Sequence, residues 1–228
     1  YKYGKLKGLT YYLYSLYYMF LLRISYKSID KFFAVSNAMI ILLTNMGVNE
    51  KNIEKIYNPI GRPNVRFPIT KLKVKYGIKN KKMILFAGRQ AKEKGIGKII
   101  EAIKDMPNVH FFIVGNKSGD YAYFLKLSKD LGISERIRFL GFKSHKDLQE
   151  LYLLTDLVVL PETFFEPLSR LLLEAASYGI PLIATKVGGN EEIIENNKNG
   201  YLLESIDNLP NKIKEILNGT KQKNLWSV

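Results

Sequence analysis

Two glutamates, Glu166 and Glu174, carry the clearest chemical signal in this chain of 228 residues. Pro167 is well suited to the first position of a helix, which would place Glu166 at the N-cap. On such a helix the two carboxylates lie roughly 80° apart around the axis and ~12 Å apart along it. This separation suits a ligand with hydroxyl groups at both ends and a diphosphate between them. A nucleotide sugar has that shape.

Glu174 lies among leucines and alanines. A carboxylate on so apolar a helix is unfavourable unless it has a partner. The alternative is that Glu166 is an ordinary helix cap and Glu174 a surface residue, but we favour a ligand. The backbone N–H groups of Leu168 and Ser169 belong to the first helical turn, where they lack partners within the helix. We therefore expect them to contribute donors to the same ligand.

A glycine-rich loop from Gly88 to Gly97 follows the apolar run Met83–Ala87 and leads into a helix. Glycine lets the backbone approach a ligand closely, and the N-terminus of the next helix attracts anions. Within this loop Arg89 can grip a phosphate with two donors and Lys94 can add a point charge. The loop is not a Walker A motif, which ends in Gly-Lys-Ser or Gly-Lys-Thr. Alone it is a weak signal for a diphosphate.

Short apolar runs alternate with amphipathic segments from about residue 72 onward. The predicted strands are Met83–Ala87, Val109–Val114, Arg136–Leu140, Leu157–Leu160, Pro181–Thr185 and Tyr201–Leu203. The predicted helices are Ile96–Asp105, Tyr121–Leu131, Ser144–Leu154, Pro167–Tyr178, Glu191–Glu195 and Ile206–Leu217. This alternation predicts an α/β fold with a Rossmann-like parallel sheet and helices on both faces. Ligands of such sheets bind at the carboxyl ends of the strands.

The first 60 residues repeat the α/β pattern on a smaller scale, with strands at Lys31–Val35 and Ile53–Tyr57 and a helix capped by Ser36. Two strands cannot form an independent sheet with a full core. We interpret residues 1–62 as the remnant of an N-terminal α/β domain with its linker, and residues 63–228 as the ligand-binding domain. Because residue 1 is Tyr, we expect a fragment or a processed product.

The composition excludes several kinds of catalytic and metal-binding site. The chain has no cysteine, which excludes disulfides and thiolate catalysis and is typical of a reducing compartment such as the cytoplasm. His110 and His145 stand far apart and match neither a zinc site nor a Ser-His-Asp triad. The net charge of +14 attracts polyanions, but the lysines are dispersed, so we do not expect nucleic acid as the partner.

An apolar, tyrosine-rich stretch lies near the start of the chain. It is shorter than the ~20 apolar residues that span a bilayer. We expect a helix packed on a neighbouring domain. The alternative is peripheral contact of residues 9–27 with the inner face of a membrane, through the tyrosines and nearby cations.

Several segments in a fixed order resemble the retaining glycosyltransferases of family 4, the group 1 glycosyltransferases, which have the GT-B architecture. The matching segments are Gly88-Arg89, Lys94-Gly95, Phe111–Gly115, Arg138–Gly141, Glu166–Ala175, Gly179–Thr185, Gly188-Gly189 with Glu192, and Asn199-Gly200. They cover about residues 81–204, and 33–36 and 56–59 resemble the segments before the family's interdomain linker. The resemblance identifies residues 63–228 as the C-terminal, donor-binding half.

This resemblance implies a hexosyl-type transferase that takes a UDP-, GDP- or ADP-sugar to a glycan, lipid-linked or small polyol acceptor with retention of configuration. Arg89 and Lys94 would hold the diphosphate, Glu166 the sugar hydroxyls and Glu174 the ribose. The residues expected to act in transfer are Glu166, Arg89 and Lys94. The residues that would lie beside the base are Arg138, Phe139 and Phe142. No cofactor and no metal are expected, because cations and helix ends stabilise the departing diphosphate.

The sequence departs from the family at Ser169-Arg170, which replace a glycine and an apolar residue and can alter the fit of the donor sugar. Most of the acceptor-binding domain is also missing, so we expect little transfer from this chain alone. Two alternatives remain: a GT-B-like nucleotide-sugar epimerase, and a non-catalytic module that binds the donor or a polyanion.

Overall fold

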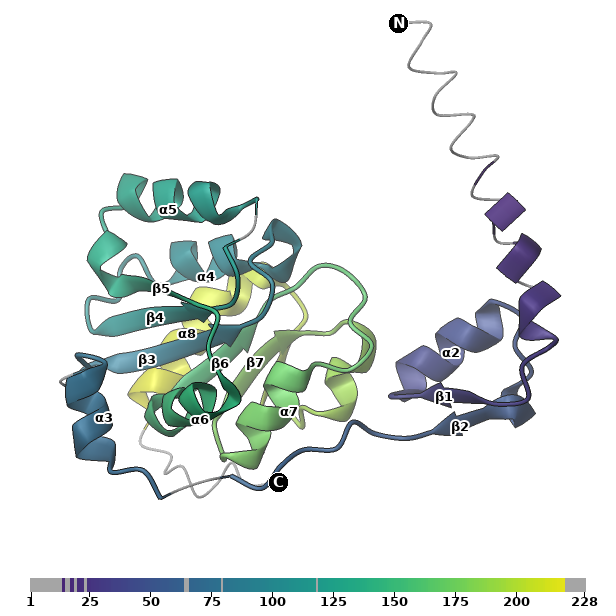
Figure 1. The fold of residues 1–228 in the computed structure, drawn as a ribbon. Helices are drawn as coiled ribbons and strands as arrows, with labels where there is room; N and C mark the ends of the chain where they lie inside the picture. Colours follow the sequence, from purple (N-terminus) through teal and green to yellow (C-terminus); the bar gives the residue numbers. More distant parts are fainter. Residues whose placement is uncertain are drawn as a thin grey trace, which may run out of the picture. The chain divides into compact units, whose positions relative to one another are not determined.

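The computed structural model describes residues 14–219 apart from positions 15, 16, 19, 23, 64, 65, 79 and 118. Its contacts divide the chain into two compact units, Tyr1–Asn58 and Pro59–Val228 (Figure 1). This division lies four residues before the domain boundary predicted after residue 62. Each unit is described by itself below.

The larger unit is built on a six-stranded sheet with the order β5-β4-β3-β6-β7-β8. The strands are β3 (Lys82–Ala87), β4 (Val109–Val114), β5 (Ile137–Gly141), β6 (Leu157–Leu160), β7 (Leu182–Thr185) and β8 (Gly200–Leu203). Every neighbouring pair is parallel. The predicted Rossmann-like parallel sheet is therefore confirmed. All four residues of β6 are buried, which explains its uninterrupted apolar sequence.

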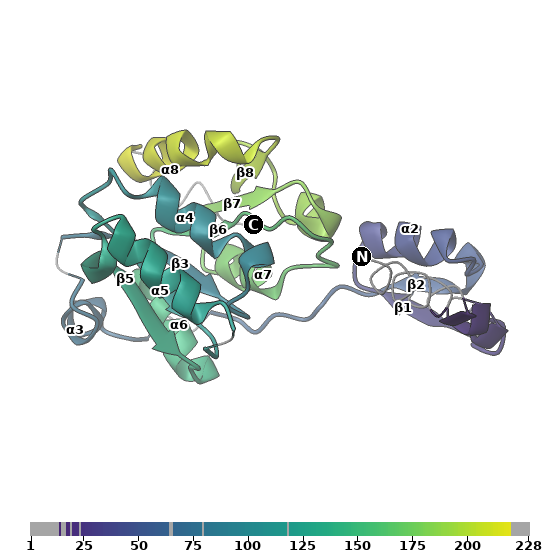
Figure 2. The ribbon, with the colours of Figure 1, turned by 90° about the horizontal axis from the view of Figure 1, so that it is seen from above.

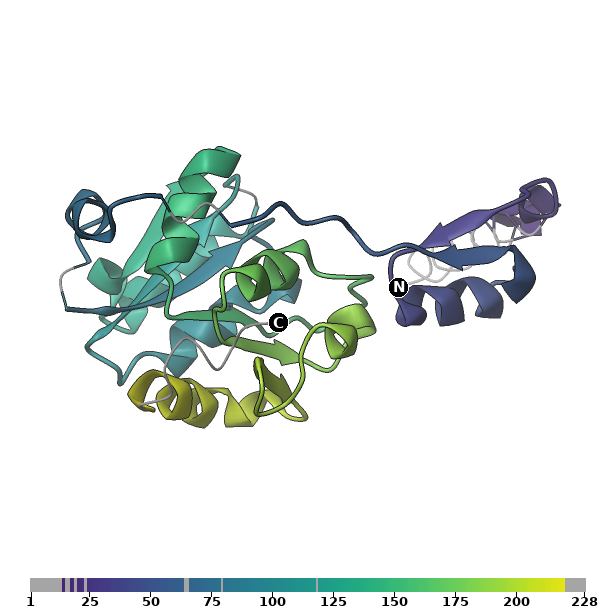
Figure 3. The same ribbon diagram turned by 90° about the horizontal axis from the view of Figure 1, so that it is seen from below.

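Helices cover both faces of this sheet (Figures 1, 2 and 3). One face carries α3 (Ile69–Lys75), α6 (His145–Leu154) and α7 (Arg170–Ser177), and the other carries α4 (Ile96–Ala102), α5 (Tyr121–Asp130) and α8 (Leu209–Asn218). The short 3₁₀ helices of this unit are η2 (Lys92–Lys94), η3 (Ser134–Arg136), η4 (Gly188–Glu192) and η5 (Ile206–Asn208). The core lies between the sheet and these helices, where aromatic residues of β3 and β4 such as Phe86 and Phe112 are fully buried.

The predicted start of one helix is wrong in a way that bears on the site. The helix predicted from Pro167 begins at Arg170 as α7. Ser169 is the N-cap, with extended backbone and a side chain that accepts a hydrogen bond from the N–H of Leu172. Glu166 and Pro167 therefore belong to the preceding loop, and Glu166 is not the helix cap. A serine hydroxyl that satisfies an otherwise unpaired N–H is a stronger helix start than proline geometry alone.

Two further predictions need correction, and one helix was not predicted. The helix predicted over Glu191–Glu195 is instead the 3₁₀ helix η4. The helix predicted over Ile206–Leu217 consists of η5 followed by α8, which has Pro210 in its first turn. Helix α3 was not predicted. Its buried Leu72 and the buried Tyr76 that ends it supply only a short helical period, which is easily overlooked.

The described residues of the smaller unit include a strand–helix–strand unit. Strands β1 (Phe32–Ala34) and β2 (Ile53–Lys55) are parallel, and α2 (Asn37–Asn45) and η1 (Glu50–Asn52) lie between them in the chain. Ser36 caps α2 as predicted, because its hydroxyl accepts from the N–H of Met39. Phe33 on β1 is 61% exposed.

Of residues 9–27, for which membrane contact was considered, residues 9–13, 15, 16, 19 and 23 lie outside the described residues. Among the residues that are described, no helix combines the length and the apolar character needed to cross a bilayer.

Backbone hydrogen bonds link the carboxyl ends of β3, β4 and β5. Gly115, which follows β4, donates its N–H to Gly141 of β5 at 2.9 Å, and Gly88, which follows β3, donates to Val114 at 3.0 Å. A Cβ atom on Gly115 would lie 1.9 Å from the carbonyl oxygen of Gly88, and its φ is +139°. Only glycine permits this approach.

We expect Gly115→Ala to lower the free energy of unfolding by roughly 2–4 kcal/mol, because it adds both a backbone clash and a strained φ. Denaturant unfolding of the purified chain measures this. Gly119→Ala is the matched control, since a Cβ there meets nothing within 4 Å. Equal stability of the two variants would contradict the close approach.

Candidate functional site

The candidate site lies where the chain reverses its direction across the sheet. From β3 the chain runs outward through β4 to β5, and it then returns to the other side of β3 with β6, β7 and β8. Parallel sheets bind ligands in the crevice outside the carboxyl ends of the two strands at such a reversal, here β3 and β6. The loops after these two strands carry most of the predicted site residues.

Gly95 presses the loop after β3 against the loop after β6. It has left-handed backbone with φ +73°, and a Cβ atom there would lie 2.2 Å from the carbonyl oxygen of Pro161. The N–H of Thr163 also donates to the carbonyl of Glu93 at 3.1 Å. These two contacts fix the backbone on either side of Lys94 and direct its side chain toward the loop that follows β6.

Lys94, which was predicted to bind phosphate, and Glu166, which was predicted to bind the sugar, belong to a single ion cluster. The Nζ of Lys94 lies 2.5 Å from Oε2 of Glu166 and 2.7 Å from Oε2 of Glu162. The three side chains are 16%, 19% and 0% exposed respectively. The ammonium group also lies 4.5 Å from the centroid of the Phe164 ring. The structure therefore brings together Lys94 and Glu166, for which the resemblance implies one common ligand, and adds Glu162.

Burial and the neighbouring charges shift the pKa values of this cluster in opposite directions. Burial alone lowers the pKa of Lys94, but its hydrogen bonds to Glu162 and Glu166 outweigh burial and raise the pKa above its usual range. Burial raises the pKa of Glu162, and the single ammonium group only partly offsets it. The directions are consistent, because Lys94 has two carboxylate partners whereas Glu162 must share its one cation with Glu166.

The loop after β7 closes the cluster from the third side. Thr185 donates its hydroxyl to the backbone carbonyl of Glu162 at 2.6 Å. Asn190 is fully buried, and its Nδ2 lies 3.1 Å from the carbonyl of Thr185 and 3.5 Å from Oε1 of Glu162. The N–H of Gly189 donates to the carbonyl of Glu166 at 2.9 Å. Both glutamates are thus held at their backbone as well as at their side chains.

Glu174 lies on α7 and has the partners that its apolar surroundings require. The Tyr152 hydroxyl donates to it at 2.9 Å and Arg170 at 3.3 Å, and its side chain is 16% exposed. Burial and the charge of Glu174 raise the pKa of Tyr152 well above its usual range, so this hydroxyl stays a donor. Because Glu166 lies outside the helix, the helical separation predicted for the two glutamates does not apply.

The remaining predicted residues occupy different positions around the strand ends. Arg89 is 63% exposed and pairs with Glu93 at 2.7 Å, and its neighbour Gly88 is the first residue after β3. Leu168 and Ser169 are both buried beside the start of α7. Their backbone role toward a ligand remains a prediction.

The three residues expected beside the base are spread along β5 and beyond it. Arg138 donates to the carbonyl of Tyr76 at 2.5 Å, near the amino end of the strand, and so fastens the end of α3. The Phe139 ring packs edge-on against Tyr121, with centroids 4.9 Å apart. Phe142 follows the carboxyl end of the strand and is 77% exposed. Of the three, Phe142 is the one placed at the ligand side of the sheet.

Sequence reasoning missed Glu162, Asn190 and Tyr152 as members of the site. Glu162 had a recognisable signal: it is a carboxylate placed just after an entirely apolar strand at a carboxyl end. Asn190 and Tyr152 had none, because each contributes through a contact with a residue far away in the sequence. Within the described part of the chain, no group of three or more His, Cys, Asp or Glu side chains could hold a metal ion.

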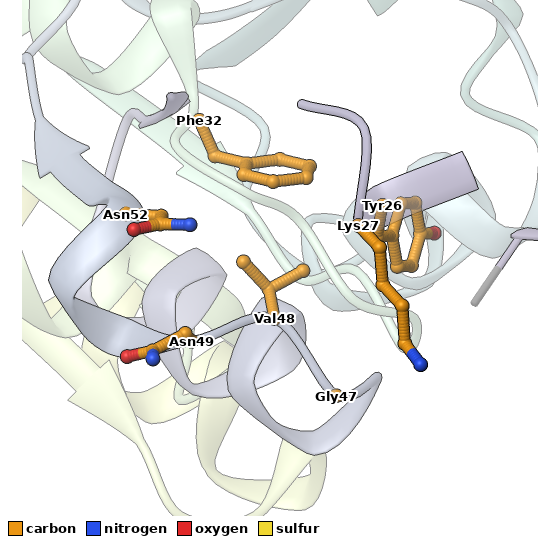
Figure 4. Close-up of a pocket in the computed structure, with 7 residues that line it drawn as sticks. All are labelled: Tyr26, Lys27, Phe32, Gly47, Val48, Asn49 and Asn52. Atoms are coloured by element: carbon orange, nitrogen blue, oxygen red, sulfur yellow. The ribbon is translucent and has the colours of Figure 1, made fainter. Parts of the chain in front are cut away.

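A separate hollow in the smaller unit carries none of the predicted site residues (Figure 4). It is lined by Tyr26, Lys27, Phe32, Gly47, Val48, Asn49 and Asn52. Its apolar side is formed by Tyr26 packed edge-on against Phe32 at 5.6 Å and by the buried Val48.

Comparison with known proteins places this geometry in a family. The family described as Glycosyl transferases group 1 matches residues 68–227, which include every loop of the site. The chain belongs to this family. The sheet and helices of the larger unit are those of GT-B glycosyltransferases. HepE of Anabaena, solved in complex with UDP and glucose, superposes with a TM-score of 0.78 at 29% identity, covering 86% of this chain and 55% of HepE.

Two curated proteins are similar in sequence to this group 1 chain. Spore coat protein SA of Bacillus subtilis is 31% identical over 72% of this chain and 46% of its own length. The N-acetyl-alpha-D-glucosaminyl L-malate synthase of Bacillus anthracis is 30% identical over 81% of this chain and 49% of its own length. The chain therefore spans about half the length of the relatives it matches.

We expect Lys94→Met to lower the free energy of unfolding by roughly 3–5 kcal/mol, because it leaves the buried Glu162 carboxylate without a cation. Lys98→Met is the control: Lys98 is 56% exposed and pairs only with Glu101, so its loss should change stability by less than about 1 kcal/mol. Denaturant unfolding compares them. Glu162→Gln in the Lys94→Met background should restore part of the loss, and no recovery would contradict this account.

The Lys94→Met variant should also gain a pH dependence. Without the ammonium group, the folded pKa of Glu162 lies further above its unfolded value, so the folded state binds the proton more tightly. Its free energy of unfolding should be highest below the unfolded pKa and should fall as pH rises through the folded one. Unfolding curves from pH 5 to pH 8 measure this slope relative to the unmodified chain, which retains the cation.

Proposed function

We propose that this chain is the donor-binding half of a retaining glycosyltransferase, which moves a sugar from a nucleoside-diphosphate sugar to a glycan, a lipid-linked acceptor or a small polyol. The observation that carries the proposal is the contact between Lys94 and Glu166 at the reversal point of the sheet. A cation for a diphosphate and a carboxylate for hydroxyl groups lie side by side there. In a sugar diphosphate the phosphate and the sugar hydroxyl groups are close together, so the cation and the carboxylate that bind them must also be neighbours.

Each part of the donor then has a counterpart among the described residues. Lys94 and Arg89 bind the diphosphate, and Glu166 accepts hydrogen bonds from the sugar. Glu174, oriented by Tyr152 and Arg170, accepts from the ribose hydroxyls. The exposed Phe142 offers a flat apolar surface to the base. The UDP bound in HepE, at 29% identity to this chain, supports a UDP-sugar, and GDP- and ADP-sugars are the alternatives.

Transfer itself requires that the negative charge developing on the departing diphosphate be stabilised. Two cations and the backbone N–H groups of the loops can supply this stabilisation in place of a metal ion. We propose metal-independent transfer on this basis, with the acceptor attacking from the face that the diphosphate leaves. Retention follows from such an attack without a protein nucleophile. The acceptor would be bound mostly by an N-terminal domain, of which Tyr1–Asn58 is a part, and residues 9–27 are proposed to contact the membrane peripherally.

Titration of the chain with UDP, GDP and ADP tests the donor site. At least one should bind and raise the thermal unfolding temperature, because a ligand specific for the folded state stabilises it by mass action.

We expect Arg89→Met to weaken that binding by about 1.5–3 kcal/mol, the usual contribution of a charged hydrogen bond. Lys198→Met is the control. Lys198 is similarly exposed, at 61%. It precedes β8 and so lies at the amino ends of the strands, whereas Arg89 lies at the carboxyl ends.

The alternatives give different results in the same experiments. Absence of binding by all three diphosphates to a folded chain would sink the donor-site proposal. An epimerase would convert the nucleotide sugar without an acceptor, which product analysis detects. A polyanion-binding module would lose affinity equally in both variants and steeply with added salt.

A further inference from the structure

Glu162 has no part in the function proposed above, yet it lies at the centre of the site. Its side chain is 0% exposed, and its carboxylate shares one ammonium group with Glu166. The nearby Arg89 is itself paired with Glu93 at 2.7 Å. The buried cluster of Lys94, Glu162 and Glu166 therefore holds one cation and two carboxylates at the place where a dianionic diphosphate is proposed to bind.

This excess of negative charge opposes a diphosphate. Like charges within ~4–6 Å of a carboxylate disfavour its ionised form. The repulsion can be relieved in two ways: a carboxylate moves into solvent, or it takes up a proton. Glu166 has the first route, because it is 19% exposed and can turn toward the hydroxyl groups of the sugar.

Glu162 lacks that route. It is closed in by Lys94 of η2 on one side and by Asn190 of η4 on another, while Thr185 of β7 binds its backbone. Lys94 and Glu166 are the charged groups that face it, and Asn190 is neutral. Burial already favours its protonated form, since it raises the pKa of Glu162.

We propose that Glu162 is the positioning residue for Lys94 and that its carboxylate takes up one proton from solvent when the diphosphate of the donor binds. The protonated carboxyl group keeps one oxygen as an acceptor for Lys94, so the lysine stays in place. The charge of Lys94 is then available to the diphosphate. The proton returns to solvent when the nucleotide leaves. This inference rests on the proposed function, because the diphosphate supplies the charge that drives the protonation.

Isothermal titration with UDP, in two buffers of different ionisation enthalpy at the same pH near 7.5, counts the protons directly. GDP or ADP replaces UDP if one of them is the diphosphate that binds. We expect an uptake approaching one proton by the unmodified chain and markedly less by Glu162→Gln, which keeps an acceptor for Lys94 but cannot be protonated. Glu101→Gln is the matched control: Glu101 is an exposed glutamate that pairs with Lys98 outside the cluster, so this variant should retain the uptake. Ionisation of the nucleotide itself contributes equally to all three proteins and cancels in the comparison.

Affinity should follow the same linkage. Binding to the unmodified chain should weaken by up to about tenfold per pH unit as pH rises, and Glu162→Gln should lose most of this slope. A purely structural role of Glu162 would lower the unfolding temperature of the variant without changing the proton count.

The outcomes are distinct. Binding of a diphosphate to the unmodified chain without proton uptake would overturn this inference and leave the donor site standing. Equal uptake by Glu162→Gln would overturn it as well. Failure of every diphosphate to bind would instead remove the proposed function. The two-buffer measurement on the unmodified chain decides the question even if Glu162→Gln does not fold.

Discussion

The buried ammonium group of Lys94 is the constraint around which the larger unit is arranged. A charge removed from water must be paired, and here two carboxylates lie within 2.7 Å of it. Those carboxylates come from positions 68 and 72 residues further along the chain, so the loops after β3 and β6 must meet for the charge to be compensated, and the loop after β7 closes around them. Gly95 permits the first two loops to touch. The third loop reaches the cluster through Gly189 and Asn190.

The sheet makes this convergence possible by its order. Because β6 pairs with β3 on the side away from β4, the loops that follow β3 and β6 emerge next to each other. Continuous apolar strands secure the order, since they can only be buried between two layers of helices. The same order keeps Arg138 away from the ligand side. It lies near the amino end of β5, where it holds the end of α3.

The departure from the family at Ser169 has a structural explanation. Where the resemblance leads us to expect glycine, this chain has a serine whose hydroxyl caps α7. The cap ends the loop three residues after Glu166 and leaves that carboxylate free of the helix. Glu166 is then positioned by Gly189 and Lys94 rather than by helical geometry. In this way one substitution at the helix start bears on the group proposed to bind the donor sugar.

The sequence by itself determined the parallel sheet, the helices over it and the position of Lys94 and Glu166 in loops at the carboxyl ends of strands. These follow from local periodicity and from the rule that parallel strands present their carboxyl ends on one edge. The tertiary structure alone decided that Glu162 shares the lysine, that Tyr152 is the partner of Glu174 and that Glu166 lies in a loop. Such outcomes depend on which distant side chains meet in a desolvated space. A buried charged or polar group is unstable without a partner, and the periodicity of the sequence does not show which distant residue becomes that partner.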